Sequence, residues 1–134
     1  MRRELILPAD ESAPVLARSA LNDAIPPPAL NERADDACLA VSELATNAVK
    51  HGQLRPGQDT IRLVIDADEE RLRIEMEQST AAIGVRAVEP RLEDPVRVGG
   101  YGLRLVEEIA DEWGVETGPP GHVWCEFRSG SSLL

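Results

Sequence analysis

A short stretch of the sequence, "SELATNAVKHG" (42–52), places side chains of different chemistry at the spacing of one helix face. Glu43 and Asn47 stand four residues apart, and Lys50 and His51 follow one turn later, before Gly52. Residues four apart on an α-helix lie nearly one above the other, so Glu43, Asn47 and His51 share one strip. Such a strip is either a solvated polar face or one wall of a ligand pocket.

The surrounding residues leave both interpretations open. Apolar residues at helical spacing predict a helix over about 31–50, with a stripe made by Ala34, Ala37, Cys38, Val41, Leu44, Ala45, Ala48 and Val49. The polar strip lies roughly opposite this stripe, and for an isolated Glu-x-x-x-Asn a solvated face is the simpler interpretation. Leu39 and Ala40 border the strip, however, which indicates partial cover of the kind that a ligand pocket requires.

A second stretch, "GGYGL" (99–103), places glycines directly before a predicted helix. Glycines let the backbone approach a ligand closely, and a helix N-terminus presents free N–H groups with a partial positive charge. This combination suits phosphate, although glycines also serve plain turns. The spacing fits neither the P-loop nor the dinucleotide-binding GxGxxG motif. No GxSxG or HExxH motif is present, and His51 and His122 lack metal-ligand spacing.

The composition is that of an acidic globular protein with an aliphatic core. The 134 residues suit one domain, and 43% of them are hydrophobic, but only two Trp, one Tyr and one Phe are aromatic. Fourteen basic and 24 acidic residues give a net charge of −10. That charge repels nucleic acid and anionic membranes, so we expect neither as a direct partner. A nucleotide carried with Mg²⁺ is partly neutralised and would not be repelled.

The N-terminus and the cysteines predict a cytoplasmic protein. "MRRELILPAD" has a basic start but no apolar stretch behind it, and no segment has the apolar length of a membrane span. Cys38 and Cys125 lie far apart without a CxxC partner, which favours two buried reduced thiols over a disulfide or a metal site.

The hydrophobic patterns predict one domain over residues 1–134, with a core of about 2–128 and a tail at 129–134. The expected elements are a strand (2–9), two helices (11–25 and 31–50), a hairpin (60–66 and 71–77), an irregular loop (78–98), a helix (99–113), and a hairpin made by "WGVETG" and "HVWCEFR". Their order predicts an α/β two-layer sandwich, in which a mixed, mainly antiparallel sheet is covered by three helices.

Two apolar faces follow from this assignment. The first helix would present Val15, Leu16, Ala20, Leu21, Ala24 and Ile25 at helical spacing. The helix after the glycines would present Leu103, Val106, Ala110 and Trp113 on one side.

Taken together, these stretches resemble the small anti-sigma-factor serine/threonine kinases, members of the ATPase superfamily shared with gyrase and sensor histidine kinases. The resemblance is carried by "SELATNAVKHG", a hairpin ending near residue 77, an irregular loop, "GYGLRLVEEIADEWGV" and a terminal "HVWCEF". It covers about residues 2–128, and the ExxxNAxxHG element is specific. It implies the histidine-kinase-like ATPase fold, ATP with Mg²⁺ as the cofactor, and phosphorylation of a partner protein.

The resemblance also implies roles for the polar strip. Asn47 takes the place of the Mg²⁺ ligand, and a hard, neutral oxygen suits that ion. Glu43 takes the place of the proposed general base, which a serine hydroxyl requires for phosphoryl transfer. His51 matches a family position near the phosphates.

The glycine stretch and the loop before it match the rest of the phosphate side. Gly100 and Gly102 correspond to glycines whose backbone lies beside the phosphates, and Leu103 completes the matched motif. Residues 84–99 correspond to the ATP lid.

Two departures from the family fall on the adenine side. Gln78 stands where the family has an Asp that accepts the adenine amino group, and Thr80 stands where Gly or Ser is common. A Gln carbonyl can still accept a hydrogen bond, but the side chain is longer and uncharged. His122 occupies the position of a Thr that helps to order the base pocket.

Three functions are compatible with these residues. The first is an ATP-dependent serine kinase of the anti-sigma type, which phosphorylates an antagonist protein and also holds a sigma factor. The second is a non-catalytic interaction module that kept the fold and lost efficient use of ATP. The third is an autonomous ATPase. Family members act through protein contacts and are often dimers, so we expect contact surfaces on the first helix and on the strand edge near residues 2–7.

Overall fold

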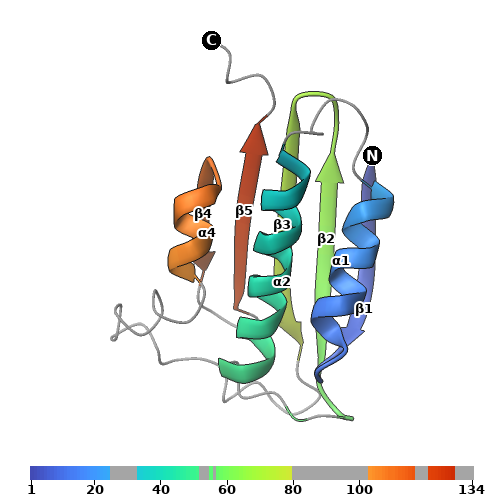
Figure 1. The fold of residues 1–134 in the computed structure, drawn as a ribbon. Helices are drawn as coiled ribbons and strands as arrows, with labels where there is room; N and C mark the ends of the chain where they lie inside the picture. Colours follow the sequence, from blue (N-terminus) through green and yellow to red (C-terminus); the bar gives the residue numbers. More distant parts are fainter. Residues whose placement is uncertain (25–32, 52–54, 56, 80–102, 117–120, 129–134) are drawn as a thin grey trace.

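The computed structural model describes residues 1–24, 33–51, 55, 57–79, 103–116 and 121–128, and of His51, Gln78 and Ser79 only the backbone (Figure 1). The elements are, in chain order, β1 (Arg2–Pro8), α1 (Ala13–Ala24), α2 (Ala34–His51), β2 (Thr60–Ala67), β3 (Arg71–Ser79), α4 (Arg104–Ile109), β4 (Glu112–Glu116) and β5 (His122–Arg128). The predicted strands, the first two helices and both hairpins are therefore confirmed. No helix among the described residues is long and apolar enough to cross a membrane.

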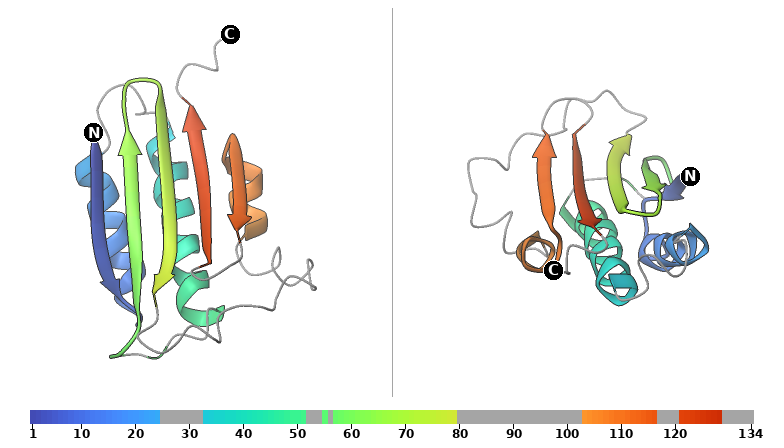
Figure 2. Two further views of the ribbon diagram at one scale, coloured as in Figure 1. Left: turned by 180° about the vertical axis from the view of Figure 1, so that it is seen from behind. Right: turned by 90° about the horizontal axis from the view of Figure 1, so that it is seen from above.

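The strands form one five-stranded sheet in the order β1-β2-β3-β5-β4. The three described helices all lie on one face of it, as Figures 1 and 2 show, so the predicted two-layer sandwich is confirmed. Each of the four pairings between described strands is antiparallel. The sheet was expected to be mixed and mainly antiparallel, and the described strands contribute only antiparallel pairs.

The strands alternate between a face that packs on the helices and an open face. Side chains of a strand point alternately to the two faces, and one face of an antiparallel sheet commonly meets the core. The core face of β2 and β3 carries Ile61, Leu63, Ile65, Leu72, Ile74 and Met76, all at most 1% exposed. β5 adds Cys125 and Phe127, and Phe127 is fully buried.

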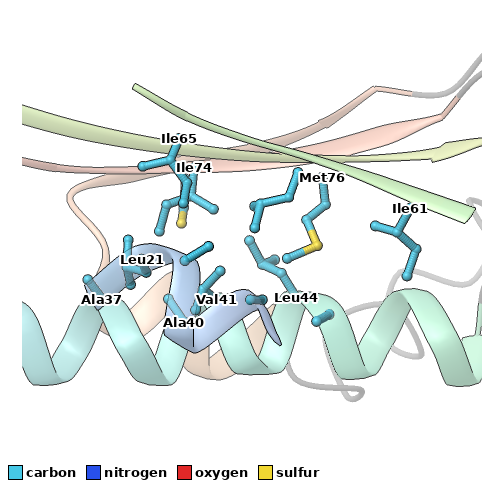
Figure 3. Packing of buried hydrophobic residues seen from close by; sticks show 14 of the residues in the cluster. Leu21, Ala37, Ala40, Val41, Leu44, Ile61, Ile65, Ile74 and Met76 are labelled. Atoms are coloured by element: carbon cyan, nitrogen blue, oxygen red, sulfur yellow. The ribbon is translucent and has the colours of Figure 1, made fainter. Parts of the chain in front are cut away.

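The helices meet the sheet through small side chains. Ala13, Ala17, Ala20 and Ala24 of α1, and Ala37, Ala40, Ala45 and Ala48 of α2, are all at most 5% exposed. Alanines let the helices approach each other and the sheet closely, and a few larger residues fill the remaining space. In Figure 3, Leu21, Val41 and Leu44 lie between the helices and the sheet residues Ile65, Ile74 and Met76.

The buried face of α1 differs from the predicted one. Val15 and Leu16 are 56% and 43% exposed, while the buried positions are Ala13, Ala17, Ala20, Leu21 and Ala24. Small residues fit where the helix lies close to α2, and the two larger residues point outward. The prediction placed large apolar side chains in the buried face of α1, whereas most residues buried there are alanines, which allow the helix to lie close to its neighbours.

The helix expected over 99–113 is shorter in its described part. α4 ends at Ile109, Ala110 is already extended (φ −89, ψ 155), and Trp113 belongs to β4, opposite Cys125 of β5. Asp111 explains the change of conformation, because its Oδ2 accepts hydrogen bonds from Nη1 of Arg33 at 3.1 Å and from the backbone N–H of Arg128 at 2.6 Å. The helical spacing of Leu103, Val106, Ala110 and Trp113 predicted a helix up to residue 113, and the predicted end was wrong, because α4 ends at Ile109.

Arg33 ties the start of α2 to the end of α4. Besides Asp111, its guanidinium donates to the carbonyls of Ile109 (2.7 Å) and Arg128 (3.4 Å). It also lies over the ring of Phe127, 5.1 Å from the centroid. The N-terminal end of α2 is thereby fixed beside the C-terminal ends of α4 and β5.

Ion pairs cover the open face of the sheet. Glu126 is only 6% exposed, and its carboxylate lies 3.0 to 3.6 Å from guanidinium nitrogens of Arg73, Arg128 and Arg71. The Arg73 guanidinium stacks over Trp124 of β5, 4.2 Å from the ring centroid. Three cations around one carboxylate compensate for its removal from water.

The Trp124 ring makes Gly114 of β4 sensitive to substitution. A Cβ at position 114 would lie 2.7 Å from Nε1 and 2.8 Å from Cε2 of that ring. We expect Gly114→Ala to lower the free energy of unfolding by about 1 to 3 kcal/mol through overpacking, measured by urea denaturation. Val115→Ala, at the exposed neighbouring position, is the control. An equal loss from Gly114→Ala in a Trp124→Leu background would contradict the steric cause.

The Cys125 thiol gives the stability a dependence on pH. Burial raises its pKa from about 9.0 to about 12. Between these values the unfolded chain loses the thiol proton and the folded protein keeps it, so stability falls as pH rises. We expect the free energy of unfolding of the wild type to fall faster with pH than that of Cys125→Val, by up to about 1.4 kcal/mol per pH unit. If the free energies of unfolding of wild type and Cys125→Val, from urea denaturation, change in parallel between pH 8 and about 10.5, the raised pKa of Cys125 is contradicted.

Candidate functional site

Glu43 and Asn47 lie beside the buried stripe of α2. Both side chains are partly buried, and they border Ala40 and Leu44, which are 0% exposed. A step of four residues turns a helix by about 400°, so Asn47 lies about 40° nearer to the buried stripe than Glu43. The two side chains are partly covered, so the fold does not produce a purely solvated face at these positions.

The strip occupies the flank of α2 that faces away from α1. On the α1 side, Arg18 donates to Ser42 Oγ at 2.8 Å, and the Cys38 thiol lies 3.2 Å from Asn22 Oδ1. Glu43 follows Ser42, and one residue turns the helix by about 100°, past the outer surface and away from α1. Figure 1 shows α4 on that other side of α2, and the two helices are in contact.

The C-terminal half of α2, the starts of β2 and β5 and the end of β3 lie at the same end of the sheet. β2 begins at Thr60 opposite Ser79, Ile61 pairs with Gln78, and β5 begins at His122 opposite Glu77. The start of α2 is held at the other end of β5 by Arg33, so the C-terminal half of α2 points toward these strand ends (Figure 1). The backbones of α2 and β3 therefore bring the predicted phosphate and adenine sides to the same end of the molecule.

The remaining predicted residues divide into two groups. Leu103, directly before α4, is 3% exposed and belongs to the hydrophobic core. Thr80, the predicted lid 84–99, Gly100 and Gly102 lie outside the described residues, as do the side chains of His51 and Gln78. Their parts in a site remain predictions.

His122 lies on the open face, apart from the helices. Its Nε2 is 3.1 Å from Oε2 of Glu75 and 3.2 Å from Oε1 of Glu116. Glu75 stands between Ile74 and Met76, whose side chains face the core, so it points to the other face. The resemblance put His122 in the base pocket, whereas in the structure its imidazole contacts Glu75 and Glu116 on the open face of the sheet, and Glu43 and Asn47 lie on α2, which covers the other face (Figure 1).

Val123, the residue after His122, points toward the helices instead. Val123 packs against the hydrophobic core, as do Cys125 and Phe127 further along β5. The alternation of "HVWCEFR", with apolar residues at every second position, was the signal that could have shown this, because it puts His122 and Trp124 on one face and Val123 on the other.

The strip offers oxygen ligands of the kind that Mg²⁺ takes. A carboxylate and a carboxamide one turn apart, both partly buried on one flank, are hard donors and fit that ion. Within the described residues, no group of three or more His, Cys, Asp or Glu could hold a metal by itself. An ion at this place would therefore need further ligands, which the phosphates of a nucleotide can supply.

Comparison with known proteins agrees with this architecture. The histidine kinase-like ATPase domain family matches residues 7–124. Among solved structures, the histidine kinase domain from the Erythrobacter litoralis EL346 blue-light activated histidine kinase superposes with a TM-score of 0.56 at 24% sequence identity. The match covers 84% of this chain and 58% of that one, and it supports the fold alone. A search of curated proteins finds no match.

The position of His122 leads to a prediction about nucleotide affinity. We expect His122→Ala to change the dissociation constant of Mg·ATP less than about twofold, because the imidazole contacts Glu75 and Glu116 on the open face. Isothermal titration calorimetry measures this, with Asn47→Ala as the variant that should lose binding. A tenfold or larger loss of Mg·ATP affinity in a folded His122→Ala protein would indicate that His122 belongs to the base pocket.

Proposed function

We infer the function from the family: this chain belongs to the histidine kinase-like ATPase domain family, and we propose that it is an ATP- and Mg²⁺-dependent serine kinase of the anti-sigma type. The observation that carries the proposal is the pair Glu43 and Asn47. The two residues stand one turn apart and are partly buried on the α4 side of α2. A base and a metal ligand are two of the side-chain functions that phosphoryl transfer uses.

Each residue of the pair has one task in the proposed reaction. The Asn47 carboxamide oxygen would hold Mg²⁺, and the ion would neutralise charge on the phosphates. Glu43 accepts the proton of an incoming serine hydroxyl. The serine oxygen forms a bond to the γ-phosphorus of ATP, and the bond from that phosphorus to the bridging oxygen of the leaving ADP breaks. The products are phosphoserine, ADP and the proton held by Glu43. His51, Gly100 and Gly102 are proposed to lie at the phosphates, with 84–99 as the lid over them.

The proposed partners are proteins. An antagonist protein would carry the accepting serine, a sigma factor is the second candidate, and a second copy of the chain is a third. The first helix and the strand edge near residues 2–7 are the proposed contact surfaces. They expose Ile6 (62%), Val15 (56%) and Leu16 (43%), which are among the most exposed large apolar side chains of the described residues. The net charge of −10 argues against direct contact with nucleic acid.

A second function is favoured by the adenine side. Gln78 replaces the acidic acceptor of the resembled family, and the His122 side chain contacts Glu75 and Glu116 on the open face. With both contacts weakened, a module that binds proteins without efficient use of ATP is the alternative. Gln78→Asp tests the adenine side: it should tighten Mg·ATP binding if the position contacts the base, and weaker binding by a folded variant would show that it does not.

Two variants separate the base from the metal ligand. Glu43→Gln keeps shape and hydrogen bonding but removes basicity, so it should leave the dissociation constant of Mg·ATP nearly unchanged and lower phosphotransfer by about 10² to 10⁴. Asn47→Ala should impair both quantities, because the metal loses its ligand. The measurements are calorimetry for binding and transfer of labelled phosphate from ATP to a candidate antagonist protein.

Glu70→Gln, at an exposed glutamate in the turn between β2 and β3, is the matched control and should behave as wild type. Equal phosphotransfer by wild type and Glu43→Gln would remove Glu43 from the mechanism. If wild type binds Mg·ATP but transfers phosphate to no candidate, the interaction module becomes the better proposal.

A further inference from the structure

Asp59 is a buried carboxylate that the proposed mechanism does not use. Among the described residues, the buried polar or charged ones are Asp59, 2% exposed, and Glu126, 6% exposed. Glu126 is explained by the arginines of the open face. Asp59 lies at the other end of the sheet, directly before β2, and its Oδ2 is 3.7 Å from Nε of Arg55. Because burying a carboxylate is costly, the contacts of Asp59 indicate what the fold gains from it.

Asp59 closes a tight turn. Its Oδ2 accepts a hydrogen bond from the backbone N–H of Arg55 at 2.7 Å, and its own N–H donates to the Arg55 carbonyl at 2.9 Å. The N–H of Gln58 donates to the same carbonyl at 3.0 Å, and Gly57 takes the positive φ of 85 that the turn needs. A hydrogen bond to a buried charge is stronger than one to an exposed charge, so this turn is held firmly.

The turn determines where β2 begins. Thr60, the next residue, is the first of the strand and pairs with Ser79, and Ile61 pairs with Gln78. On the other side of β3, the pairing with β5 starts only at Glu77 opposite His122. Among the described strands, β2 is therefore the only partner of Gln78 and Ser79, and it pairs with them through its first two residues, which directly follow Asp59.

We propose that Asp59 is a positioning residue for the nucleotide site: by locking the turn 55–59, it holds the end of β3, and with it Gln78, at the adenine side. This inference rests on the proposed function, because it assigns the base side of that same site. Asp59 acts through the first two rungs of the β2–β3 ladder. Loss of its carboxylate should weaken contacts to the base and leave contacts to the phosphates unchanged.

The chain offers a matched control at the opposite end of the same strand. Asp68 follows β2 and also shapes a turn, since its Oδ1 accepts the N–H groups of Glu70 at 2.8 Å and Arg71 at 2.9 Å. Its turn leads into the start of β3, far from Gln78 along the strand. A general effect of loosening this hairpin would appear in both variants, whereas positioning of the nucleotide site would appear only at Asp59.

The first experiment compares two ligands by calorimetry at a temperature where circular dichroism shows each protein folded. For Asp59→Asn we expect the dissociation constant of Mg·ATP to rise about fivefold to tenfold and that of Mg·tripolyphosphate to change less than about twofold. Gly57→Ala strains the same turn through its φ of 85, without a steric clash, and should give the same selective loss. Asp68→Asn should leave both constants unchanged.

The second experiment needs no ligand. Consecutive residues of β3 direct their N–H groups to opposite sides, so one of Gln78 and Ser79 donates its amide to β2. Amide hydrogen exchange at that residue should be faster in Asp59→Asn than in wild type, while exchange at Ile74, in the middle of β3, stays the same. Unchanged Mg·ATP affinity, equal weakening of both ligands, or unchanged exchange at Gln78 and Ser79 would each overturn the role of Asp59. Failure of the wild type to bind Mg·ATP would overturn the proposed function, and the exchange rates would still show whether Asp59 holds the end of β3.

Discussion

The packing of the alanine face of α2 against the sheet is the constraint on which the candidate site depends. Ala40, Leu44 and Ala48 are at most 4% exposed, so the rotation of the helix about its axis is fixed. A turn by one residue, about 100°, would carry Glu43 or Asn47 into the core and leave a polar group without water. The same contacts that stabilise the fold therefore hold the pair on the flank beside α4. A site built on such a helix needs little further support for its orientation.

The one-sided cover of the sheet has a second consequence. The helices take the apolar side of each strand, and the other side must be polar where it meets water. On this open face Glu126 is surrounded by arginines, and Trp124 is covered by Arg73. His122 obeys the same alternation, because the next residue, Val123, packs against the core and successive side chains of a strand point to opposite faces. Register along β5 thus decides which residues can reach a ligand under the helix layer.

The sequence predicted those features that depend on local patterns. Hairpins at 60–79 and 112–128, the long amphipathic helix and the two-layer arrangement follow from apolar periods and turn residues near each other in the chain. The end of α4 could not be predicted in this way, because it depends on Asp111 meeting Arg33, which is distant in sequence. The exposure of Leu16 likewise depends on how closely α1 approaches α2. For the site, the pairing of Glu43 with Asn47 was predictable from spacing, and the alternation of "HVWCEFR" could have indicated the face of His122. Its contacts with Glu75 and Glu116 depend on the pairing between strands and could not be predicted in this way.

The two halves of the candidate site are anchored to the fold with unequal strength. Asn47 lies within an 18-residue helix whose inner face is fully packed, so a metal on that side meets a rigid support. Gln78 stands at the end of β3, where β2 alone of the described strands holds the backbone and a buried aspartate fixes the start of β2. A substitution on the base side can therefore alter nucleotide affinity while the core stays intact, whereas the phosphate side is bound to the packing of the core. Under the proposed function, changes on the base side would therefore alter nucleotide affinity alone, whereas loss of Asn47 would impair both affinity and phosphoryl transfer.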